Sequence, residues 1–203
     1  KLFRRHRYRY LFDELIKNNE TRNNLAADIA GEEMERGETV LVLVATKEQG
    51  RYIQSRVEGS RFICSKPEKH EGKRDEILDS VRMGHCKCLV ATSLADVGLD
   101  LPMIGVIVMA CGGKGGKHGQ LIKQRAARGQ RLFGDKSRVV IHDFIDRSDE
   151  TLRNHSYARQ KAYRELGFLN HIEIRGTENV KYHKHTKDYF HHGRRERFIP
   201  NLK

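Results

Sequence analysis

The aliphatic residues of this chain gather in short runs that are separated by polar and turn-forming residues. The clearest run is Val40–Val44, which is continuous, aliphatic and rich in β-branched side chains. Such a run is typical of a strand that is buried on both faces of a parallel sheet. Similar runs follow at residues 61–64, 88–91, 104–109 and 138–144. We therefore predict five strands.

Helical periodicity lies before and between these runs. Apolar residues three and four positions apart predict helices at residues 21–36, 47–57, 73–83, 121–132 and 150–166. Gly37 follows the first of these segments and is a C-terminal stop signal. Strands that alternate with helices of this length indicate βαβ units. The expected fold is therefore α/β, with a parallel sheet sandwiched by helices.

Both ends of the chain are basic. Residues 1–20 begin with a basic and aromatic stretch and then show helical spacing, so we expect a basic linker or helix ahead of a main domain at 21–168. Residues 169–203 contain many histidines, lysines and arginines but few aliphatic side chains. This composition predicts a basic, His-rich appendage or a mobile tail. The first residue is Lys, which predicts that the chain is a fragment or has been processed.

The charge of the chain narrows the classes of partner. The 203 residues include 39 Lys and Arg against 27 Asp and Glu, which gives a formal charge of +12. Such a charge predicts a polyanionic partner, with nucleic acid ahead of an anionic membrane. No apolar run is long enough to span a bilayer, and we expect no membrane partner. Four irregularly spaced cysteines predict reduced thiols and an intracellular, cytoplasmic location.

Two groups of residues could in principle bind a metal ion. Cys86 and Cys88 lie one residue apart in an expected strand, and no second pair of thiols accompanies them. Four histidines near the C-terminus do not have the spacing of a standard zinc finger; they are His183, His185, His191 and His192. We therefore predict no metal site, and we interpret these histidines as part of a basic, solvated tail.

Polar residues that follow the strands are the first candidates for binding, because ligands of open α/β sheets lie beyond the carboxyl ends of the strands. Thr46 and Lys47 follow the first run, where a hydroxyl and an amine at a helix start can meet a phosphate. Taken alone, they fit an N-cap and a solvated lysine better. Thr92 follows the 88–91 run, and its hydroxyl can also meet a phosphate. Beyond it, Gly98 permits close backbone approach, and the Asp100 carboxylate suits a ribose hydroxyl.

The segment from residue 111 to residue 131 is strongly basic. Its glycine-rich part, 111–119, is not a P-loop, because Lys117 is followed by His118, and we favour a surface loop there. Gln124, Arg128 and Arg131 are spaced i, i+4 and i+7, so on a helix they would share one face. Such a face suits a clamp on a phosphoryl group. From composition alone, a solvated basic face is the simpler interpretation.

Together, these segments resemble the second RecA-like domain of a superfamily 2 helicase. Val40–Lys47 resembles helicase motif IV, Val90–Pro102 resembles motif V, and Gln124–Arg131 resembles motif VI, usually written QRxGRxxR. Their order and spacing also agree with the family. Arg22-Asn23 and the Asp143–Tyr163 segment resemble the flanks of one subgroup, which contains the phage UvsW-type and XPB-like DNA helicases. The resemblance covers about residues 18–168.

The resemblance implies a role for each matching residue. The residues expected to contact nucleic acid are Thr46, Lys47, Thr92, Ser93 and Arg125. Gly98 and Asp100 would lie at the ATP edge, Gln124 would lie near the γ-phosphate, and Arg128 and Arg131 would be arginine fingers. Ala127 stands where the family usually has Gly, and one extra methyl group there could shift Arg128. This departure bears on the efficiency of hydrolysis more than on the family.

The chain carries only part of what an ATPase of this family needs. It contains no Walker A sequence, G-x-x-x-x-G-K-[ST], and no DEAD/DEAH-type box. Val139–Asp143 followed by Asp146 is similar to a Walker B strand, but in a chain without a P-loop we interpret it as a structural strand end. ATP and Mg²⁺ would then be held mainly by an N-terminal RecA-like domain of the same protein. We expect this chain alone to be inactive as an ATPase.

The sequence thus predicts the second motor domain of an ATP-dependent helicase or translocase. DNA is the first expected partner and RNA the second. Two alternatives stay open. One is a RecA-like module that binds nucleic acid without a catalytic role. The other is the motor part of a larger restriction or chromatin-remodelling translocase.

Overall fold

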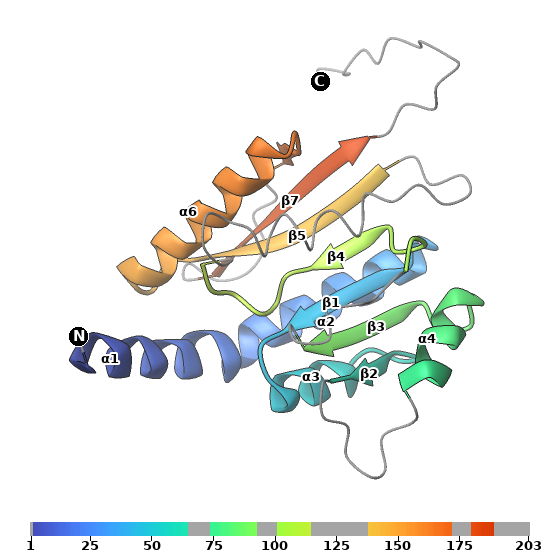
Figure 1. Cartoon of the computed structure of the whole chain (residues 1–203), viewed down its shortest axis with the longest axis horizontal. Coiled ribbons are helices and arrows are strands. Elements are labelled where there is room, and N and C mark those ends of the chain that lie inside the picture. The colour runs from blue at the N-terminus through green and yellow to red at the C-terminus, as the bar shows by residue number, and fades with distance from the viewer. Residues whose placement is uncertain (1, 65–73, 93–100, 115–137, 172–179, 189–203) are drawn as a thin grey trace.

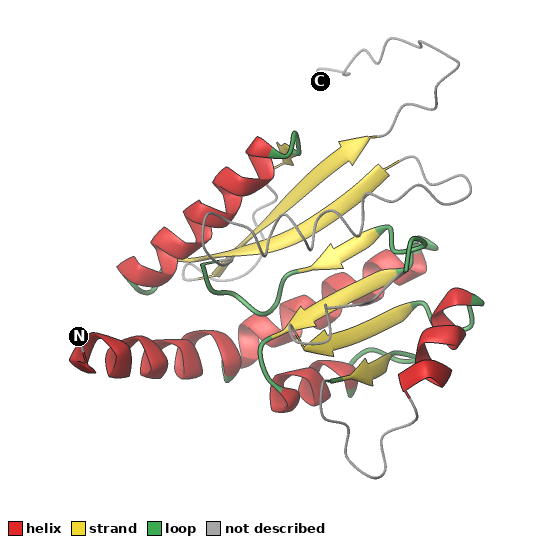
Figure 2. Cartoon of the chain, viewed as in Figure 1, coloured by secondary structure: helices red, strands yellow, loops and turns green. Residues whose placement is uncertain are grey.

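A computed structural model of the chain describes residues 2–64, 74–92, 101–114, 138–171 and 180–188. For residues 2–5, 169–171, 180–183 and 186–188 only the backbone is described. The described part is a single seven-stranded sheet with helices on both sides (Figures 1 and 2).

The order of the strands across the sheet is β2-β3-β1-β4-β5-β7-β6. The strands are β1 (Val40–Val44), β2 (Arg61–Ile63), β3 (Cys88–Thr92), β4 (Val106–Val108), β5 (Arg138–Asp146), β6 (Leu169–His171) and β7 (Val180–Asp188). Strands β1 to β5 are parallel to one another, whereas β7 is antiparallel to both β5 and β6. The parallel strands place their carboxyl ends at one edge of the sheet, which we call the carboxyl edge.

The helices cover both faces of the sheet. They are α1 (Leu2–Phe12), α2 (Glu20–Glu35), α3 (Lys47–Gln54), α4 (Arg74–Arg82) and α6 (Glu150–Glu165), with a short π-helix, η1 (Asp13–Lys17), between the first two. On one face, Val40, Val42 and Val44 of β1 pack in a core with α2 and α3. On the other face, Leu41 and Leu43 pack in a core with α4 and α6. Alternate residues of one strand thus supply two separate cores, as a strand between two helical layers must.

The fold class predicted from the sequence is confirmed. The five predicted strands form, and four of the five predicted helices lie where the periodicity placed them, with ends that differ by up to three residues. The fifth, at residues 121–132, lies outside the described residues. The predicted stop at Gly37 has a φ of 87°, which only glycine adopts without strain, so the C-terminal signal of α2 is met.

The C-terminal segment departs in part from the expected appendage or tail. Leu169–His171 and Val180–Asp188 are strands of the main sheet, and β7 pairs with β5 from Val180↔Asp146 to Asp188↔Arg138. His185, expected in a solvated tail, is fully buried, and its ring centroid lies 4.5 Å from that of Tyr163. The interpretation of His185 as solvated was wrong, because β7 places its side chain in the buried layer beside Tyr163. His191, His192 and the remaining C-terminal residues lie outside the described part, and the boundary at residue 168 stays a prediction.

The basic N-terminal segment is helical. In Figure 1, α1 continues nearly in line with α2 and projects past the carboxyl ends of β1 and β3. Two contacts join α1 to the start of α6: Arg7 Nη2 lies 3.0 Å from Asp149 Oδ2, and the Tyr8 ring lies 5.3 Å from the ring of His155. This helix therefore lies beside the carboxyl edge.

Candidate functional site

Three of the residues predicted to contact nucleic acid are described, and all three lie at the carboxyl edge. Thr92 is the last residue of β3 and pairs in register with Val44, the last residue of the neighbouring strand β1. Thr46 follows in the turn that leads from Val44 into α3, and Lys47 is the first residue of that helix. The parallel pairing of β1 with β3 thus brings motif IV and motif V residues to one place.

Thr46 is the N-cap of α3. Its Oγ1 accepts a hydrogen bond from the backbone N–H of Gln49, at 3.3 Å. The pKa of the exposed Glu48 carboxyl is lowered, first by a hydrogen bond from its own backbone N–H and then by one from the Thr46 hydroxyl. Thr46 therefore forms the helix N-cap that the sequence predicted as its simpler role. This cap fixes the start of α3, where Lys47 lies.

Thr92 has an unusual environment for a hydroxyl group. Its side chain is only 6% exposed, and its Oγ1 has no hydrogen-bond partner among the described residues. Buried polar groups of native proteins are nearly always hydrogen-bonded. A buried hydroxyl at the end of a parallel strand is therefore well placed to donate a hydrogen bond to a bound anion.

The other predicted site residues lie outside the described residues. They are Ser93, Gly98, Asp100, Gln124, Arg125, Arg128 and Arg131. Ala127 and the glycine-rich loop beyond Lys114 lie there too. Their roles toward ATP and nucleic acid stay predictions, and the geometry of the chain supports no step that passes through ATP.

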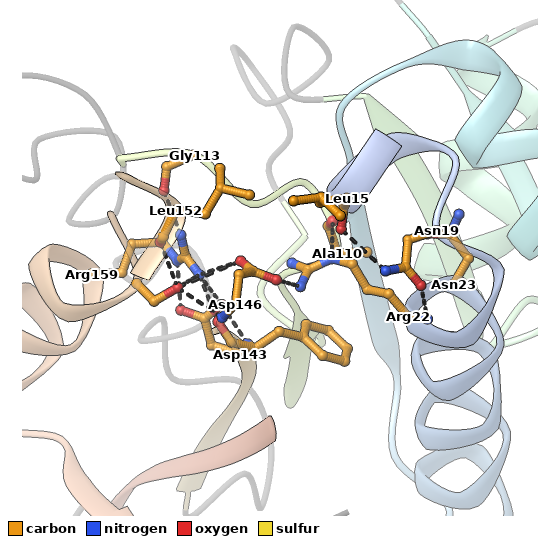
Figure 3. A network of polar contacts seen from close by, with 12 residues as sticks. Leu15, Asn19, Arg22, Asn23, Ala110, Gly113, Asp143, Asp146, Leu152 and Arg159 are labelled. Atoms are coloured by element: carbon orange, nitrogen blue, oxygen red, sulfur yellow. Dashed lines mark hydrogen bonds and ion pairs between the residues drawn. The ribbon is translucent and has the colours of Figure 1, made fainter. Parts of the chain in front are cut away.

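A buried ionic network, which sequence reasoning did not assemble, lies at the same edge (Figure 3). We call it the edge network, and its members are Arg22, Asp143, Asp146, Ser156, Arg159 and Tyr163. Arg159 of α6 holds Asp143 with two hydrogen bonds, Nε to Oδ2 at 2.8 Å and Nη2 to Oδ1 at 3.0 Å. Tyr163 donates its hydroxyl hydrogen to the same Asp143 Oδ2, at 3.0 Å. Arg22 of α2 pairs with Asp146 at the end of β5.

The charges of Asp143 and Arg159 support each other, whereas burial outweighs the pairing of Arg22 with Asp146, so the pKa of Asp146 is raised and that of Arg22 is lowered. Burial alone would raise the pKa of Asp143, but the charge and hydrogen bonds of Arg159 outweigh it and hold that pKa below its usual value. The pKa of Arg159 is raised, because Asp143 and Asp146 outweigh the desolvation of its guanidinium. The guanidinium of Arg22 also lies 4.4 Å from the centroid of the Phe144 ring, a cation–π contact. Asp143 and Asp146 thus serve as partners of arginines, which agrees with the interpretation of this strand end as structural.

The edge network also holds the loop that follows β4. Arg22 Nε donates to the carbonyl oxygen of Ala110 at 3.4 Å, and Arg159 Nη1 donates to the carbonyl oxygen of Gly113. This loop leads directly into residues 115–137. The only sequence signal for the network was the resemblance of Arg22-Asn23 and Asp143–Tyr163 to one helicase subgroup, which assigned no contacts.

A second ionic cluster lies midway along β5 around a buried carboxylate. We call it the mid-strand cluster, and its members are Glu33, Arg36, His142 and Lys184. Glu33 Oε1 lies 2.6 Å from Arg36 Nη1, 3.1 Å from His142 Nε2 and 3.5 Å from Lys184 Nζ. Burial opposes the charge of Glu33, but the hydrogen bond and charge of His142, with Lys184 and Arg36, lower the pKa of Glu33 to about 2. The cluster joins α2 to β5 and β7.

Among the described residues, no group of three or more potential ligands gathers to hold a metal ion, and no helix is long and apolar enough to cross a membrane. All four cysteines are buried, and no disulfide links them. Cys86 Sγ donates to the carbonyl oxygen of Cys88 at 3.2 Å, and burial raises the pKa of Cys88 to about 12.

The chain is similar in sequence to parts of known proteins. A relative, the pre-mRNA-splicing ATP-dependent RNA helicase PRP28 of Gibberella zeae, is 31% identical over 110 residues, which cover 47% of this chain and 15% of that protein. UvrABC system protein B of Thermus thermophilus is 28% identical over 166 residues, which cover 75% of this chain and 24% of that protein. The chain therefore spans only a small part of each relative.

A solved structure shares the fold. The crystal structure of T4 UvsW superposes with a TM-score of 0.58 and 13% identity, covering 78% of this chain and 35% of UvsW. At this identity the likeness shows the fold alone. The model of the family described as the helicase conserved C-terminal domain matches residues 18–132. Since this match spans more than half of the chain, the chain belongs to the helicase conserved C-terminal domain family, the second RecA-like domain of superfamily 2 helicases.

Proposed function

We propose that the chain is the second motor domain of an ATP-dependent nucleic-acid helicase or translocase. The observation that carries this proposal is the juxtaposition of Thr46, Lys47 and Thr92 at the carboxyl edge within a domain of this family. The Thr92 hydroxyl and the Lys47 amine beside the ends of parallel strands suit the phosphates of a nucleic-acid backbone. The buried Thr92 hydroxyl, with no partner among the described residues, fits a contact that is completed only when nucleic acid binds.

In this proposal, ATP lies between the chain and an N-terminal RecA-like domain that carries the ligands of Mg²⁺. Gly98 and Asp100 would lie beside the nucleotide, and Gln124 would lie near its γ-phosphate. Arg128 and Arg131 would stabilise the charge that develops on the transferred phosphoryl group. Closure of the two domains on ATP would shift Thr92 and Lys47 along the strand, which couples hydrolysis to movement.

The nature of the nucleic acid is a finer part of the proposal. The sequence resemblance to UvsW-type and XPB-like helicases favours DNA, and Ser93 and Arg125 would join its contacts. The relative PRP28 is named as an RNA helicase, so RNA is the second candidate. A binding-only module would use the same edge but would not need Arg128 and Arg131.

Binding by the chain itself tests the nucleic-acid half of the proposal. Fluorescence anisotropy with labelled single-stranded DNA, duplex DNA and RNA gives the affinity and its salt dependence. We expect Lys47→Ala to weaken binding and to lower the slope of log K against log salt by about one unit, because one phosphate contact is lost.

Lys87→Ala is the matched control. Lys87 is exposed and lies just before β3, at the opposite edge of the sheet. Lys87→Ala therefore removes one positive charge, as Lys47→Ala does, but at a place distant from the proposed track. We expect its affinity to stay close to that of the wild type. Equal losses in the two variants would mean that only the overall charge attracts the nucleic acid, and the proposed track would be wrong.

A further inference from the structure

The carbonyl oxygen of Ala110 accepts hydrogen bonds from side chains of two helices. Arg22 Nε of α2 donates to it at 3.4 Å, and Gln49 Nε2 of α3 donates to it at 3.2 Å. Ala110 is fully buried and lies two residues beyond β4. The loop after β4 is thus fixed by side chains that come from the start of α2 and the start of α3.

Both polar atoms of the Gln49 side-chain amide form hydrogen bonds. Its Oε1 accepts a hydrogen bond from the backbone N–H of Ala45 at 2.8 Å, while Nε2 also donates to Asn23 Oδ1 at 2.9 Å. The partners fix the orientation of the amide, because the Ala45 N–H can only donate and the Ala110 carbonyl can only accept. One side chain, 2% exposed, therefore bridges the turn after β1 and the loop after β4.

The loop beyond Ala110 has little freedom to adjust independently. Gly112 and Gly113 have φ angles of 57° and 79°, and a Cβ on Gly112 would lie 2.9 Å from Ile16 Cγ2. The Gly113 carbonyl is held by Arg159. A displacement of the Ala110 carbonyl would therefore have to move the whole 110–113 loop rather than one peptide.

Two hydrogen bonds join the turn after β1 to Gln49. Ala45 bonds to its side chain, and Thr46 Oγ1 accepts a hydrogen bond from its backbone N–H. A ligand that engages Thr46 or Lys47 acts on the residues that position Gln49. The described contacts form an unbroken chain from that turn, through the Gln49 amide, to the 110–113 loop.

We propose that Gln49 is a positioning residue that transmits nucleic-acid binding at the 45–47 turn to the 110–113 loop. This inference rests on the proposed function, since it takes the 45–47 turn as part of the nucleic-acid track. Asn23 and Arg22 orient the Ala110 end of the bridge, where they contact Gln49 Nε2 and the Ala110 carbonyl oxygen, and Gln49 itself does not touch the nucleic acid. The 110–113 loop is the point where the chain enters the segment that carries the predicted arginine fingers.

Hydrogen exchange of the chain, followed by mass spectrometry with and without a single-stranded oligothymidine or oligouridine, tests this transmission. In the wild type, we expect the oligonucleotide to slow exchange several-fold in the 45–47 turn and also at residues 110–114. In Gln49→Met, which has similar length but no amide, we expect the slowing at 45–47 to persist and that at 110–114 to disappear. Gln54→Met, which removes an amide from the end of the same helix, is the control and should behave like the wild type.

A merely structural role for Gln49 would raise exchange at 110–114 in the unbound variant but would leave the response to the oligonucleotide intact, and this result would overturn the proposal. Slowing at 45–47 without any change at 110–114 in the wild type would overturn it too, even if Gln49→Met does not fold. If neither oligonucleotide binds at all, the nucleic-acid track and this inference both fail. Binding without transmission refutes the inference alone.

Discussion

Two ionic clusters with buried carboxylates fasten β5 to helices, and they differ in the groups that balance those carboxylates. The edge network balances Asp143 and Asp146 with two arginines. The mid-strand cluster balances one carboxylate, Glu33, with a mixture of His, Lys and Arg. Arginine stays protonated at every pH at which the protein folds, so the cations of the edge network do not titrate.

The two clusters also differ in what they hold. The mid-strand cluster joins the C-terminal end of α2 to β5 and β7. The edge network, in addition, donates hydrogen bonds to the carbonyls of Ala110 and Gly113, which belong to a loop of the carboxyl edge. Similar chemistry therefore serves stability in one place and the geometry of the candidate site in the other.

Removal of Arg159 should have the largest effect. In Arg159→Met, Asp143 stays buried but loses both hydrogen bonds from the guanidinium, and the free energy of unfolding should fall by about 3–5 kcal/mol. Urea denaturation measures this loss. Arg153→Met, an exposed position of the same helix, should change the free energy of unfolding by less than about 0.5 kcal/mol. Comparable losses in the two variants would contradict the account of the edge network.

Acid should act strongly through the mid-strand cluster. The pKa of Glu33 is about 2 in the folded protein against 4.5 for the unperturbed carboxyl, so its contribution to stability is present above pH 4.5 and is lost as the pH falls toward 2. That loss corresponds to at most about 3 kcal/mol. Glu33→Gln should flatten this part of the curve of unfolding free energy against pH.

The lowered pKa of Asp143 contributes to acid sensitivity in the same direction. The difference between the wild type and Glu33→Gln, followed by urea denaturation at a series of pH values, isolates Glu33. If the two curves stay parallel from pH 5 down to the lowest pH at which the protein folds, the mid-strand cluster does not carry a depressed carboxyl.

Substitution of Thr92 should change stability least. It therefore distinguishes a role in nucleic-acid binding from a role in packing. Thr92→Val keeps the shape of the side chain but removes a buried hydroxyl that has no partner among the described residues. The free energy of unfolding should therefore stay within about 1 kcal/mol of the wild-type value or rise. Affinity for single-stranded nucleic acid, measured by anisotropy, should fall. Full affinity in this variant would remove Thr92 from the track.

Local sequence patterns predicted the parallel part of the sheet well. Val40–Val44 and residues 88–91 are apolar on both faces, and their short length between polar residues favours strands over helices. The pattern did not reveal β7, because its sequence, VKYHKHTKD, is rich in charged residues and its place depends on pairing with β5. His185 was accordingly taken for a solvated residue.

The sequence predicted only those parts of the candidate site whose residues directly follow a strand. Thr46, Lys47 and Thr92 each follow an aliphatic run, so their meeting at one edge follows from a parallel sheet. Arg22 and Asp146, by contrast, are 124 residues apart, and nothing in the local pattern pairs them. A buried arginine looks like a surface arginine in a sequence, so the edge network needed the structure.

The most direct test of the central claim is nucleic-acid-stimulated ATP hydrolysis by a polypeptide that joins this chain to an N-terminal RecA-like domain with the Walker motifs. Arg128→Ala is compared with the wild type and with Arg82→Ala, a change at an exposed arginine of α4. We predict a loss of about 10³-fold or more in kcat for Arg128→Ala, as expected for an arginine finger, and little change for Arg82→Ala. Stimulated hydrolysis that is unchanged in Arg128→Ala would contradict the claim that this chain completes the ATPase site.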